Sequence, residues 1–418
     1  MNLKTNLIFL IIIGLFLSAL ISRNSSVLLL AFPFVSYLIA GFFTAPNNVN
    51  LVISRKIEKY RAEENEPNSM KVTIINNGSN LPSLFLNDSF LPELTFISGR
   101  PNQVISLEKD QSIELEYSFT AKRGYYYWPE IKAIASDPFN LVINEINQTD
   151  EVDFIVIPKK VILPKIPLKP RYTLQSPGLN LSNKPGSGVD FWGIRQYTSG
   201  DSLGHIHWRL SAQYPNKFFI KQFEQENMAD IGILIDASKP YNASEEVISL
   251  VNYCVEAGAA ISRSLLRSGN RVSLLVVGKN RTRVFPGTGK HQLQRILDTL
   301  AGCEPGDLPP HELLKYIPIR LFSSRTTIIV ISPLQQNDHS IITKLRAEGY
   351  QVMLICPNPL PSMIANNNQL ESSLSLRAVR IEREIMLWKI RQIGVNVIDW
   401  PIEQPLVSLF QMSRQIRL

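Results

Sequence analysis

The sequence predicts a multi-domain protein: an N-terminal transmembrane helical hairpin, an all-β sandwich, and then a doubly wound α/β domain. Three patterns carry this prediction. They are two uncharged apolar runs before residue 50, alternation of apolar and polar residues over 51–158, and alternating strands and helices after 225. With 418 residues and 27 prolines, the chain is long enough for several cores joined by stiff connections.

Residues 1–50 are expected to cross a membrane twice. The runs 6–21 and 27–43 carry no charge, and each with its flanks is about long enough to cross the bilayer core. A cleaved signal peptide is the alternative, but no small-residue cleavage site precedes the second run. Lys4 and the four basic residues within 55–61 outweigh the single Arg23 in the turn. The positive-inside rule therefore places both ends of the hairpin, and the soluble domains, in the cytoplasm.

Residues 51–158 are predicted to form a small antiparallel β-sandwich. Segments such as KVTIINN, SIELEYSF and DFIVIP alternate with period two, and clusters of Asn, Gly and Pro separate them. Residues 159–225 are expected to be an extended linker and a motif segment, because prolines are frequent up to residue 185.

Residues 226–418 are predicted to form the doubly wound α/β domain. Unbroken apolar strands between amphipathic helices are typical of a parallel sheet that is covered on both faces. The expected strands are DIGILIDAS, RVSLLVVG, TTIIVIS, YQVMLIC and VNVIDW, and the expected helices lie near 244–268, 289–301, 338–348 and 378–393.

Composition argues against two classes of function. The net charge is +7, but the 43 lysines and arginines are spread along the chain, so no nucleic-acid partner is expected. The three cysteines, Cys254, Cys303 and Cys356, provide neither a disulfide framework nor a metal-ligand spacing. Buried free thiols in a reducing compartment are the simpler interpretation.

Asp236 and Ser238 follow a predicted central strand, at the edge where open α/β sheets bind ligands. This Asp-x-Ser is similar to the first part of the metal-ion-dependent adhesion site of von Willebrand factor A domains, which holds a divalent cation through oxygen. Thr288 is the candidate for the threonine of a second loop. Pro240 stands in place of a second serine, and Ser332 stands where an aspartate is expected. We therefore expect no cofactor, with weak binding of Mg²⁺ or Mn²⁺ left open, and we expect Asp236 to cap a helix or to order its loop.

The segment 186–212, GSGVDFWGIRQYTSGDSLGHIHWRLSA, is dense in charged and aromatic residues. Its two histidines stand two positions apart and the other three are scattered, which does not fit a zinc site. A structural or interaction motif is favoured over a catalytic one, with a buried ion-pair network among Arg195, Asp201 and Arg209. The residues assigned to this motif are Arg195, Tyr197, Asp201, His205, His207, Trp208 and Arg209.

Three segments carry a family resemblance. The first contains Phe191, Gly193, Ile194, Arg195, Tyr197, Gly200, Asp201, Ile206, Trp208, Ala212, Phe223 and Glu226, followed by Asp236 and Ser238. The others are AKRGYYYWPE at 121–130 and SDPFNLV at 136–142. Together they resemble the domain of unknown function 58 family over most of the chain. The sequence departs from that family at Asn140, where Gly is usual, and at His205 and His207, where Arg and Asp are more common.

The resemblance implies a bacterial, membrane-anchored protein with a von Willebrand factor A-like domain, of a kind commonly encoded beside a MoxR-type AAA+ ATPase. It implies no established enzymatic activity. We therefore expect a non-enzymatic adaptor in the bacterial inner membrane that presents this domain to a cytoplasmic partner, a MoxR-type ATPase. The alternative is a metal-dependent binding module or hydrolase that uses the Asp236 and Ser238 edge.

Overall fold

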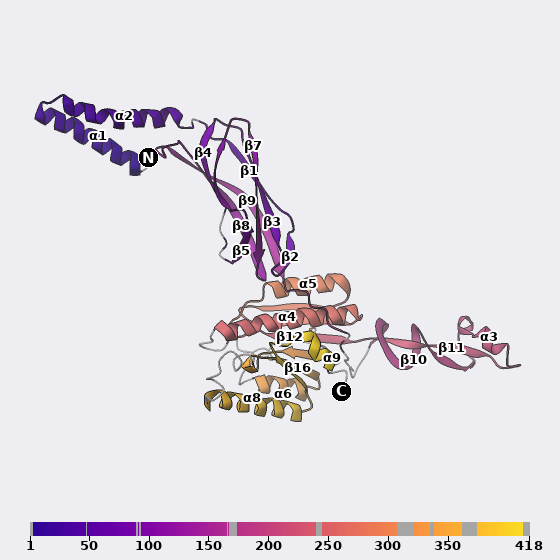
Figure 1. Ribbon diagram of the computed structural model, residues 1–418. Helices are drawn as coiled ribbons and strands as arrows, with labels where there is room; N and C mark the ends of the chain where they lie inside the picture. The colour runs from indigo at the N-terminus through magenta and orange to yellow at the C-terminus, as the bar shows by residue number, and fades with distance from the viewer. Residues whose placement is uncertain are drawn as a thin grey trace. The chain divides into compact units, whose positions relative to one another are not determined.

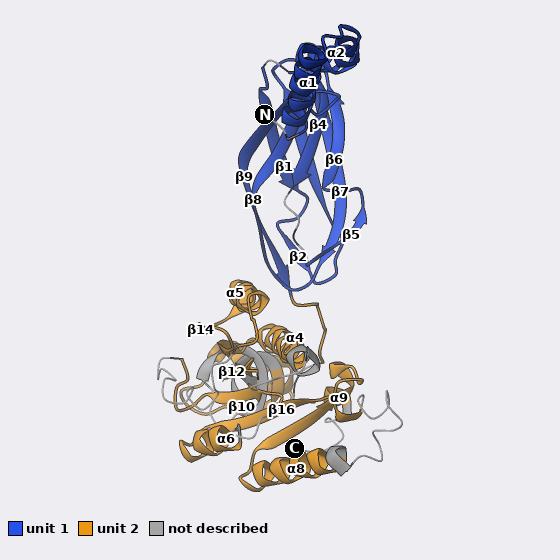
Figure 2. Cartoon of the chain, turned by 90° about the vertical axis from the view of Figure 1, so that its left-hand side faces the viewer, with its two compact units in different colours: residues 1–157 blue, residues 158–418 orange. Residues whose placement is uncertain are grey.

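The computed structural model describes the chain as two compact units, residues 1–157 and 158–418 (Figure 2). The first unit contains the predicted hairpin and β domain, and the second contains everything that follows. The description covers all residues except 1–2, 47, 89–90, 92, 165, 167–173, 240–244, 307–320, 335–337, 362–373 and 413–418.

The hairpin consists of two antiparallel helices, α1 (Leu3–Ser22) and α2 (Ser26–Thr44) (Figure 1). Both are long and apolar enough to cross a membrane, with mean hydropathies of 2.4 and 2.1. Only 11% and 17% of the two apolar stretches are buried, so neither is the core helix of a soluble domain. Their outward leucine, isoleucine and phenylalanine side chains are those that a lipid environment accommodates.

The β domain contains two sheets, which contribute side chains to one core. One sheet has the order β1-β3-β7-β5, from β1 (Leu51–Ile57), β3 (Asn68–Asn76), β7 (Ser112–Ala121) and β5 (Leu94–Ser98). The other has the order β2-β9-β8-β4-β6, from β2 (Arg61–Glu63), β9 (Ile143–Ile157), β8 (Gly124–Ser136), β4 (Leu81–Asp88) and β6 (Asn102–Leu107). The pairings are antiparallel except for the short parallel pair β2-β9.

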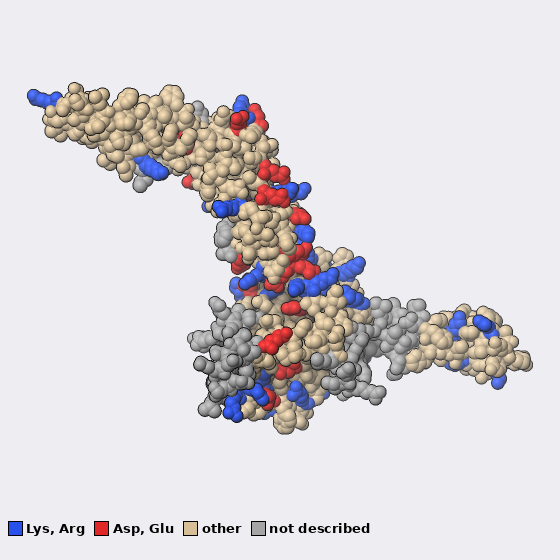
Figure 3. Space-filling view, in the orientation of Figure 1, with Lys and Arg blue, Asp and Glu red and all other residues tan. Residues whose placement is uncertain are grey.

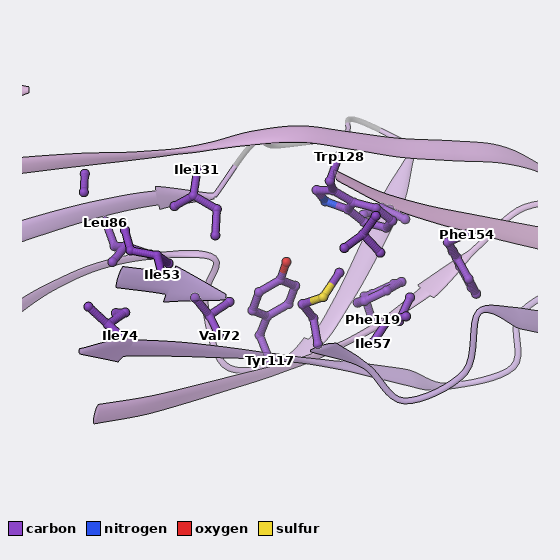
Figure 4. Close-up of a cluster of buried hydrophobic side chains, with 14 of the residues drawn as sticks. Ile53, Ile57, Val72, Ile74, Leu86, Tyr117, Phe119, Trp128, Ile131 and Phe154 are labelled. Atoms are coloured by element: carbon purple, nitrogen blue, oxygen red, sulfur yellow. The ribbon is translucent and has the colours of Figure 1, made fainter. Parts of the chain in front are cut away.

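Aromatic side chains fill the centre of this core (Figure 4). The Phe119 ring lies 5.9 Å from that of Trp128 and 5.8 Å from that of Phe154, and the second pair meets edge to face. Such contacts add to the hydrophobic stabilisation that burial itself provides. The period-two pattern of β1, in which alternate side chains are buried, follows from having one face on this core.

A buried ion pair joins the two sheets. The Arg55 Nη2 of β1 lies 2.8 Å from the Asp88 Oδ1 of β4, and both side chains are fully buried. Arg55 Nη1 also donates to the carbonyl oxygens of Trp128 and Asp150, at 3.2 and 2.7 Å. The Tyr117 hydroxyl donates to Asp88 Oδ2 at 2.7 Å, and burial together with the Asp88 charge raises the pKa of Tyr117. Arg55, one of the basic residues counted after the hairpin, is therefore a core residue in the folded chain.

The second unit is built on a six-stranded mixed sheet of order β14-β13-β12-β15-β16-β17. This order, with the first strand in the middle, is that of doubly wound folds. The parallel strands are β12 (Asp230–Asp236), β13 (Arg271–Val277), β15 (Thr327–Ile331), β16 (Gln351–Asn358) and β17 (Asn396–Pro401). The helices include α4 (Glu245–Arg267), α5 (Gly289–Ala301), α6 (Asp338–Ala347), α8 (Leu374–Gln392) and α9 (Leu406–Met412).

The edge strand β14 (Arg281–Gly287) runs antiparallel to β13 and was not expected from the sequence. Half of it is exposed, and it carries three polar or charged residues in succession, so it lacks the apolar run of the central strands. The sheet is therefore mixed, and not parallel throughout as predicted.

A separate two-stranded ribbon precedes this sheet. It pairs β10 (Leu174–Gln196) with β11 (Phe219–Met228) in antiparallel register, interrupted by several bulges. The loop between the strands contains a 3₁₀ turn, η1 (Leu203–His205), and a short helix, α3 (Trp208–Ser211). Much of the predicted linker and motif segment is thus a β-hairpin, whose period-two pattern the glycines and bulges obscure.

We predict that Asp88→Ala lowers the free energy of unfolding of the β domain by about 3–5 kcal/mol, because it leaves the Arg55 guanidinium buried and unpaired. Hydrogen exchange over β1, β3 and β7 of the full chain would measure this domain by itself. Lys71→Ala is the matched control, since Lys71 and Glu114 are exposed and 3.8 Å apart, and it should cost less than about 1 kcal/mol. Equal losses in the two variants would contradict the structural role of the buried pair.

Candidate functional site

The carboxyl edge of the six-stranded sheet brings together Asp236, Ser238 and Ser332. Asp236 ends the buried strand β12 and is 2% exposed. Its Oδ1 accepts hydrogen bonds from the Ser238 backbone N–H at 3.0 Å and the Ser238 hydroxyl at 2.5 Å. Its Oδ2 accepts from the Ser332 hydroxyl at 3.0 Å. The serine that stands where the metal site would have an aspartate therefore acts as a donor to Asp236.

Burial raises the pKa of the Asp236 carboxyl, and the hydrogen bonds from Ser238 and Ser332 oppose this shift. Both carboxylate oxygens already have donors within the protein. No group of three or more His, Cys, Asp or Glu side chains that could hold a metal occurs among the residues that the structure describes. As it stands, this arrangement orders two loops around one buried carboxyl group.

The backbone of the loop after α5 covers the same edge. Gly306 N–H donates to the carbonyl oxygen of Ala237, and Lys239 N–H donates to that of Gly306, at 3.1 and 2.8 Å. A Cβ at position 306 would lie 2.0 Å from the backbone nitrogen of Lys279, so this close approach requires glycine. The sequence offered no signal for this contact except the glycine itself.

The loop after β15 is held in an unusual conformation beside Asp236. Leu334 has φ 65°, a left-handed value that leucine rarely adopts. Its N–H donates to the Ser332 hydroxyl at 3.0 Å, so Ser332 connects the strained residue to Asp236.

Thr288 does not join this group. It follows Gly287, which pairs with Val272 at the start of β13, whereas Asp236 pairs with Val277 at the end of β13. The two positions are five strand residues apart, roughly 16 Å at about 3.3 Å per residue. Because β14 runs antiparallel, Thr288 lies at the amino edge of the sheet, as the N-cap residue of α5. Pro240, the other position in the metal-site comparison, lies outside the described residues.

A hollow of about 450 Å³ lies further along the carboxyl edge, between the ends of β16 and β17 and helix α8. Arg383 lines it and pairs with Asp399 at 2.7 Å, while Asp399 also accepts from the Asn358 side chain at 3.0 Å. Arg380 and Glu384, which also line it, pair with each other at 3.2 Å. Because these charges cancel within the hollow, it offers no clear selectivity for an ionic ligand.

At the tip of the ribbon, Arg195 and Asp201 form a two-pronged ion pair. Arg195 Nη1 and Nη2 donate to Asp201 Oδ2 and Oδ1, at 2.7 and 2.6 Å. Thr198 completes the turn, because its N–H donates to Asp201 Oδ2 at 2.8 Å and its hydroxyl accepts from Arg195 at 2.7 Å. The pKa of Asp201 is lowered mainly by the hydrogen bond from Arg195, and to a smaller extent by the hydrogen bond from the Thr198 backbone N–H. Tyr197 lies between Arg195 and Thr198 in the sequence. Its N–H donates to the Phe218 carbonyl oxygen and so extends the pairing of β10 with β11 by one residue.

The expected buried network is therefore wrong in two respects. The Arg195 and Asp201 side chains are 39% and 18% exposed, so the pair lies at the surface. Arg209 is exposed, and no ion pair to it occurs in the described part of the chain. The turn is too short to exclude water from both partners, so the pair orients the tip and adds little stability.

The two histidines have separate structural roles. His207 precedes α3, and its Nδ1 accepts the N–H of Leu210 at 3.1 Å, which makes it the N-cap of that helix. The His205 ring packs edge to face on Phe223 at 5.1 Å. With one Nδ1 occupied by a cap, they do not form a paired metal site in this geometry.

The most distinctive property of the tip is exposed apolar surface. Trp208 packs its ring edge against Phe218 at 6.4 Å, yet both side chains remain more than half exposed. The exposed large apolar side chains of this segment are Phe191, Trp192, Ile194, Leu203, Trp208, Tyr214 and Phe218. We call these seven residues the tip patch.

We predict that Asp236→Asn leaves the melting temperature of the full chain unchanged or raises it at about pH 8, because a neutral amide keeps a hydrogen-bond acceptor for Ser238 and a donor for Ser332. Since folding raises the pKa of Asp236, the ionised group opposes folding above that pKa. The advantage of the variant should therefore shrink as pH falls through the folded pKa.

Ser238→Ala is the control, because it keeps the charge and removes a donor, and it should lower the melting temperature most at high pH. A large destabilisation by Asp236→Asn, with a wild-type melting temperature that rises on adding Mg²⁺ or Mn²⁺, would indicate a metal site instead.

The solved structures to which the chain is similar include three that cover about a quarter of it. A CARDB domain from Pyrococcus furiosus, solved with di-metal ions, has 19% identity over 27% of this chain and 96% of that chain, with a TM-score of 0.20. A FixG-related protein from Vibrio parahaemolyticus has 18% identity over 25% of this chain and 95% of that chain, with a TM-score of 0.18. The cupredoxin domain of amoB from Nitrosocaldus yellowstonii has 8% identity over 27% of this chain and 88% of that chain, with a TM-score of 0.20. Scores this low carry no argument about fold or function.

No curated protein matches the chain. The model of the family described as "Protein of unknown function DUF58" matches residues 193–352. This segment contains most of the tip patch, the Arg195–Asp201 pair, and the strand that ends at Asp236. The resemblance to that family expected from the sequence is thereby confirmed over residues 193–352.

Proposed function

We propose that the protein is a membrane-tethered, non-enzymatic adaptor of the bacterial inner membrane, which presents its α/β unit to a cytoplasmic partner. The proposed partner is a MoxR-type AAA+ ATPase, which is the association that the resemblance in sequence implies. Two long apolar helices supply the anchor.

The tip patch is the observation that carries this proposal. Seven large apolar side chains within residues 191–218 are exposed, and Trp208 and Phe218 pack against each other. Tryptophan and tyrosine are enriched in protein interfaces, and exposed apolar surface often marks a site that another molecule covers. The Arg195–Asp201 turn and the His207 cap hold the loop in one conformation, which lowers the entropy lost on binding.

The charge around the patch indicates the kind of surface it fits. Residues 191–223 contain four basic side chains, Arg195, Arg209, Lys217 and Lys221, and one acidic side chain, Asp201. On the face shown in Figure 3, the tip of the ribbon carries blue side chains and no red ones. An acidic partner surface with an apolar centre would complement it.

The α/β unit is proposed to be von Willebrand factor A-like. Its strand order and its Asp-x-Ser at the carboxyl edge support this assignment. Because Asp236 is already satisfied by two serines, the edge serves the adaptor as an ordered loop cluster without a bound cation.

The alternative function is a metal-dependent binding module or hydrolase at this edge. Two observations favour it: burial raises the pKa of Asp236, as often occurs at functional sites, and the strained Leu334 lies in the adjoining loop. It would need Mg²⁺ or Mn²⁺ to displace the hydroxyl donors and bind the same oxygens.

The proposed topology is two-pass, with both ends of the chain and both soluble parts in the cytoplasm. Lys4 and the basic residues of 55–61 support it. Arg55 is buried after folding, but the positive-inside rule acts on the chain as it inserts, before the β domain forms.

We predict that a green fluorescent protein fused after residue 418 fluoresces in bacterial cells, while alkaline phosphatase at the same point is inactive. Alkaline phosphatase inserted in the turn between α1 and α2 should be active, because that turn faces the periplasm. The reverse pattern would overturn the orientation.

We predict that replacing Trp208 and Phe218 together by serine reduces co-purification of the MoxR-type ATPase from solubilised membranes by about tenfold or more. Trp388→Ser is the matched control, since Trp388 is 59% exposed on α8 and lies outside the tip patch. Its recovery of the ATPase should equal that of the wild type. Equal recovery from all three proteins would contradict the role of the tip patch, and absence of the ATPase from the wild-type sample would contradict the assigned partner.

A further inference from the structure

The loop between β8 and β9 contacts the hairpin directly. The Thr5 hydroxyl of α1 donates to the Leu141 carbonyl oxygen at 2.8 Å, and both residues are almost completely buried. The Phe139 ring lies 4.9 Å from the Tyr37 ring of α2. A Cβ at Gly41 would lie 2.5 Å from the Leu141 Cδ1, so α2 approaches the loop as closely as glycine permits. One loop of the β domain thus packs against both helices.

This loop is preorganised by one carboxylate. Asp137 is fully buried, and its oxygens accept the backbone N–H groups of Phe139, Leu141 and Val142 at 2.9, 2.7 and 2.7 Å. Asn140 has φ 57°, a left-handed conformation that asparagine tolerates better than most residues. The result is a rigid loop that turns Leu141 inward and leaves Phe139 at the surface, 36% exposed.

Helix geometry places this contact within the depth of a bilayer. At about 1.5 Å per residue, Tyr37 lies roughly 17 Å along α2 from Ser26, and Gly41 lies roughly 22 Å from it. The hydrocarbon core of a bilayer is about 30 Å thick, so the 19 residues of α2 are all needed to cross it. If α2 crosses the membrane, Tyr37 and the Phe139 ring tilted against it cannot lie wholly outside the lipid.

We propose that the β8–β9 loop, residues 137–142, is a second membrane contact, in which Phe139 and Pro138 enter the leaflet beside the hairpin. The inference rests on the membrane anchoring proposed above. The occupant of the exposed Phe139 face is lipid, because the loop is continuous with the lipid-facing surface of α2, where Phe42 and Phe43 are 58% and 87% exposed. The charged side chain of the loop, Asp137, is buried and accepts hydrogen bonds from three N–H groups, so the exposed face of the loop carries no charge.

This contact gives the β domain two attachments to the membrane. A single tether at α2 would let the domain swing, whereas the Thr5 and Gly41 contacts join the loop to both helices. Small and hydroxyl side chains at these positions allow the close packing that helices use within membranes. Tyr37 and the Phe139 ring beside it lie deeper than the end of α2, roughly 10 Å from Thr44 at about 1.5 Å per residue.

The test uses the full chain in vesicles of phosphatidylcholine and phosphatidylglycerol. Cysteine introduced at Phe139 is labelled with a fluorophore that is sensitive to polarity, and quenching by lipids with nitroxide-bearing acyl chains is measured. The native Cys254, Cys303 and Cys356 are buried, and labelling of the wild type measures their background. Pro138→Cys provides a second position in the same loop, should loss of the Phe139 ring disturb the contact.

Two control positions make the outcomes distinct. Tyr125→Cys, at the start of β8 and 57% exposed, should be unaffected by the quenching lipids, and Phe16→Cys, 55% exposed on α1, should be quenched. We expect quenching at 139 and 138 to exceed that at 125 by about twofold or more. If labels at positions 139 and 138 are quenched no more than the label at position 125, while the label at position 16 is quenched, the proposed loop contact is wrong. The membrane anchoring by the hairpin is then still supported. If 16 is not quenched either, the proposed membrane anchoring fails.

Discussion

Carboxylates that folding removes from water need hydrogen-bond donors, and much of this architecture depends on how that need is met. An unpaired buried charge costs several kcal/mol, so each such group must be built into its surroundings. In the β domain, Asp88 of one sheet is met by Arg55 and Tyr117 of the other, which ties the two sheets together. Asp137 closes the β8–β9 loop through backbone N–H groups, and Asp236 joins two loops of the α/β unit.

Two surfaces of the second unit differ in how their carboxylates obtain hydrogen-bond donors. At the carboxyl edge, Asp236 and its two serines satisfy one another, and the Gly306 backbone covers them. At the ribbon tip, Asp201 and Arg195 satisfy one another at the surface and leave the aromatic side chains around them exposed. Around Asp236, the edge where α/β sheets usually bind ligands is therefore occupied by internal hydrogen bonds, whereas seven large apolar side chains of the ribbon remain exposed. This contrast is the physical basis for favouring an adaptor over an enzyme.

In the first unit, the hairpin and the β domain share side-chain contacts. Gly41 and Thr5 let the loop after β8 approach the helices, and the loop keeps its shape through Asp137 whether or not lipid surrounds it. These contacts add to the covalent link between α2 and β1, so the hairpin and the β domain meet through side chains as well as through the chain itself.

Two uncharged apolar runs of membrane-spanning length determined the hairpin. Hydrophobic periodicity determined the β-rich region and most strands and helices of the α/β unit, because burial of a face acts on every residue of a segment. The family motif was also readable from single residues. The positions of the candidate site residues were decided by strand pairing and by contacts between distant segments. Thr288 follows a strand whose direction depends on its neighbour β13, and this places it at the opposite edge from Asp236. Likewise, Arg55 is a core residue and Arg195 a surface one, because the exposure of a charge depends on which distant segments cover it. Local sequence does not contain that information.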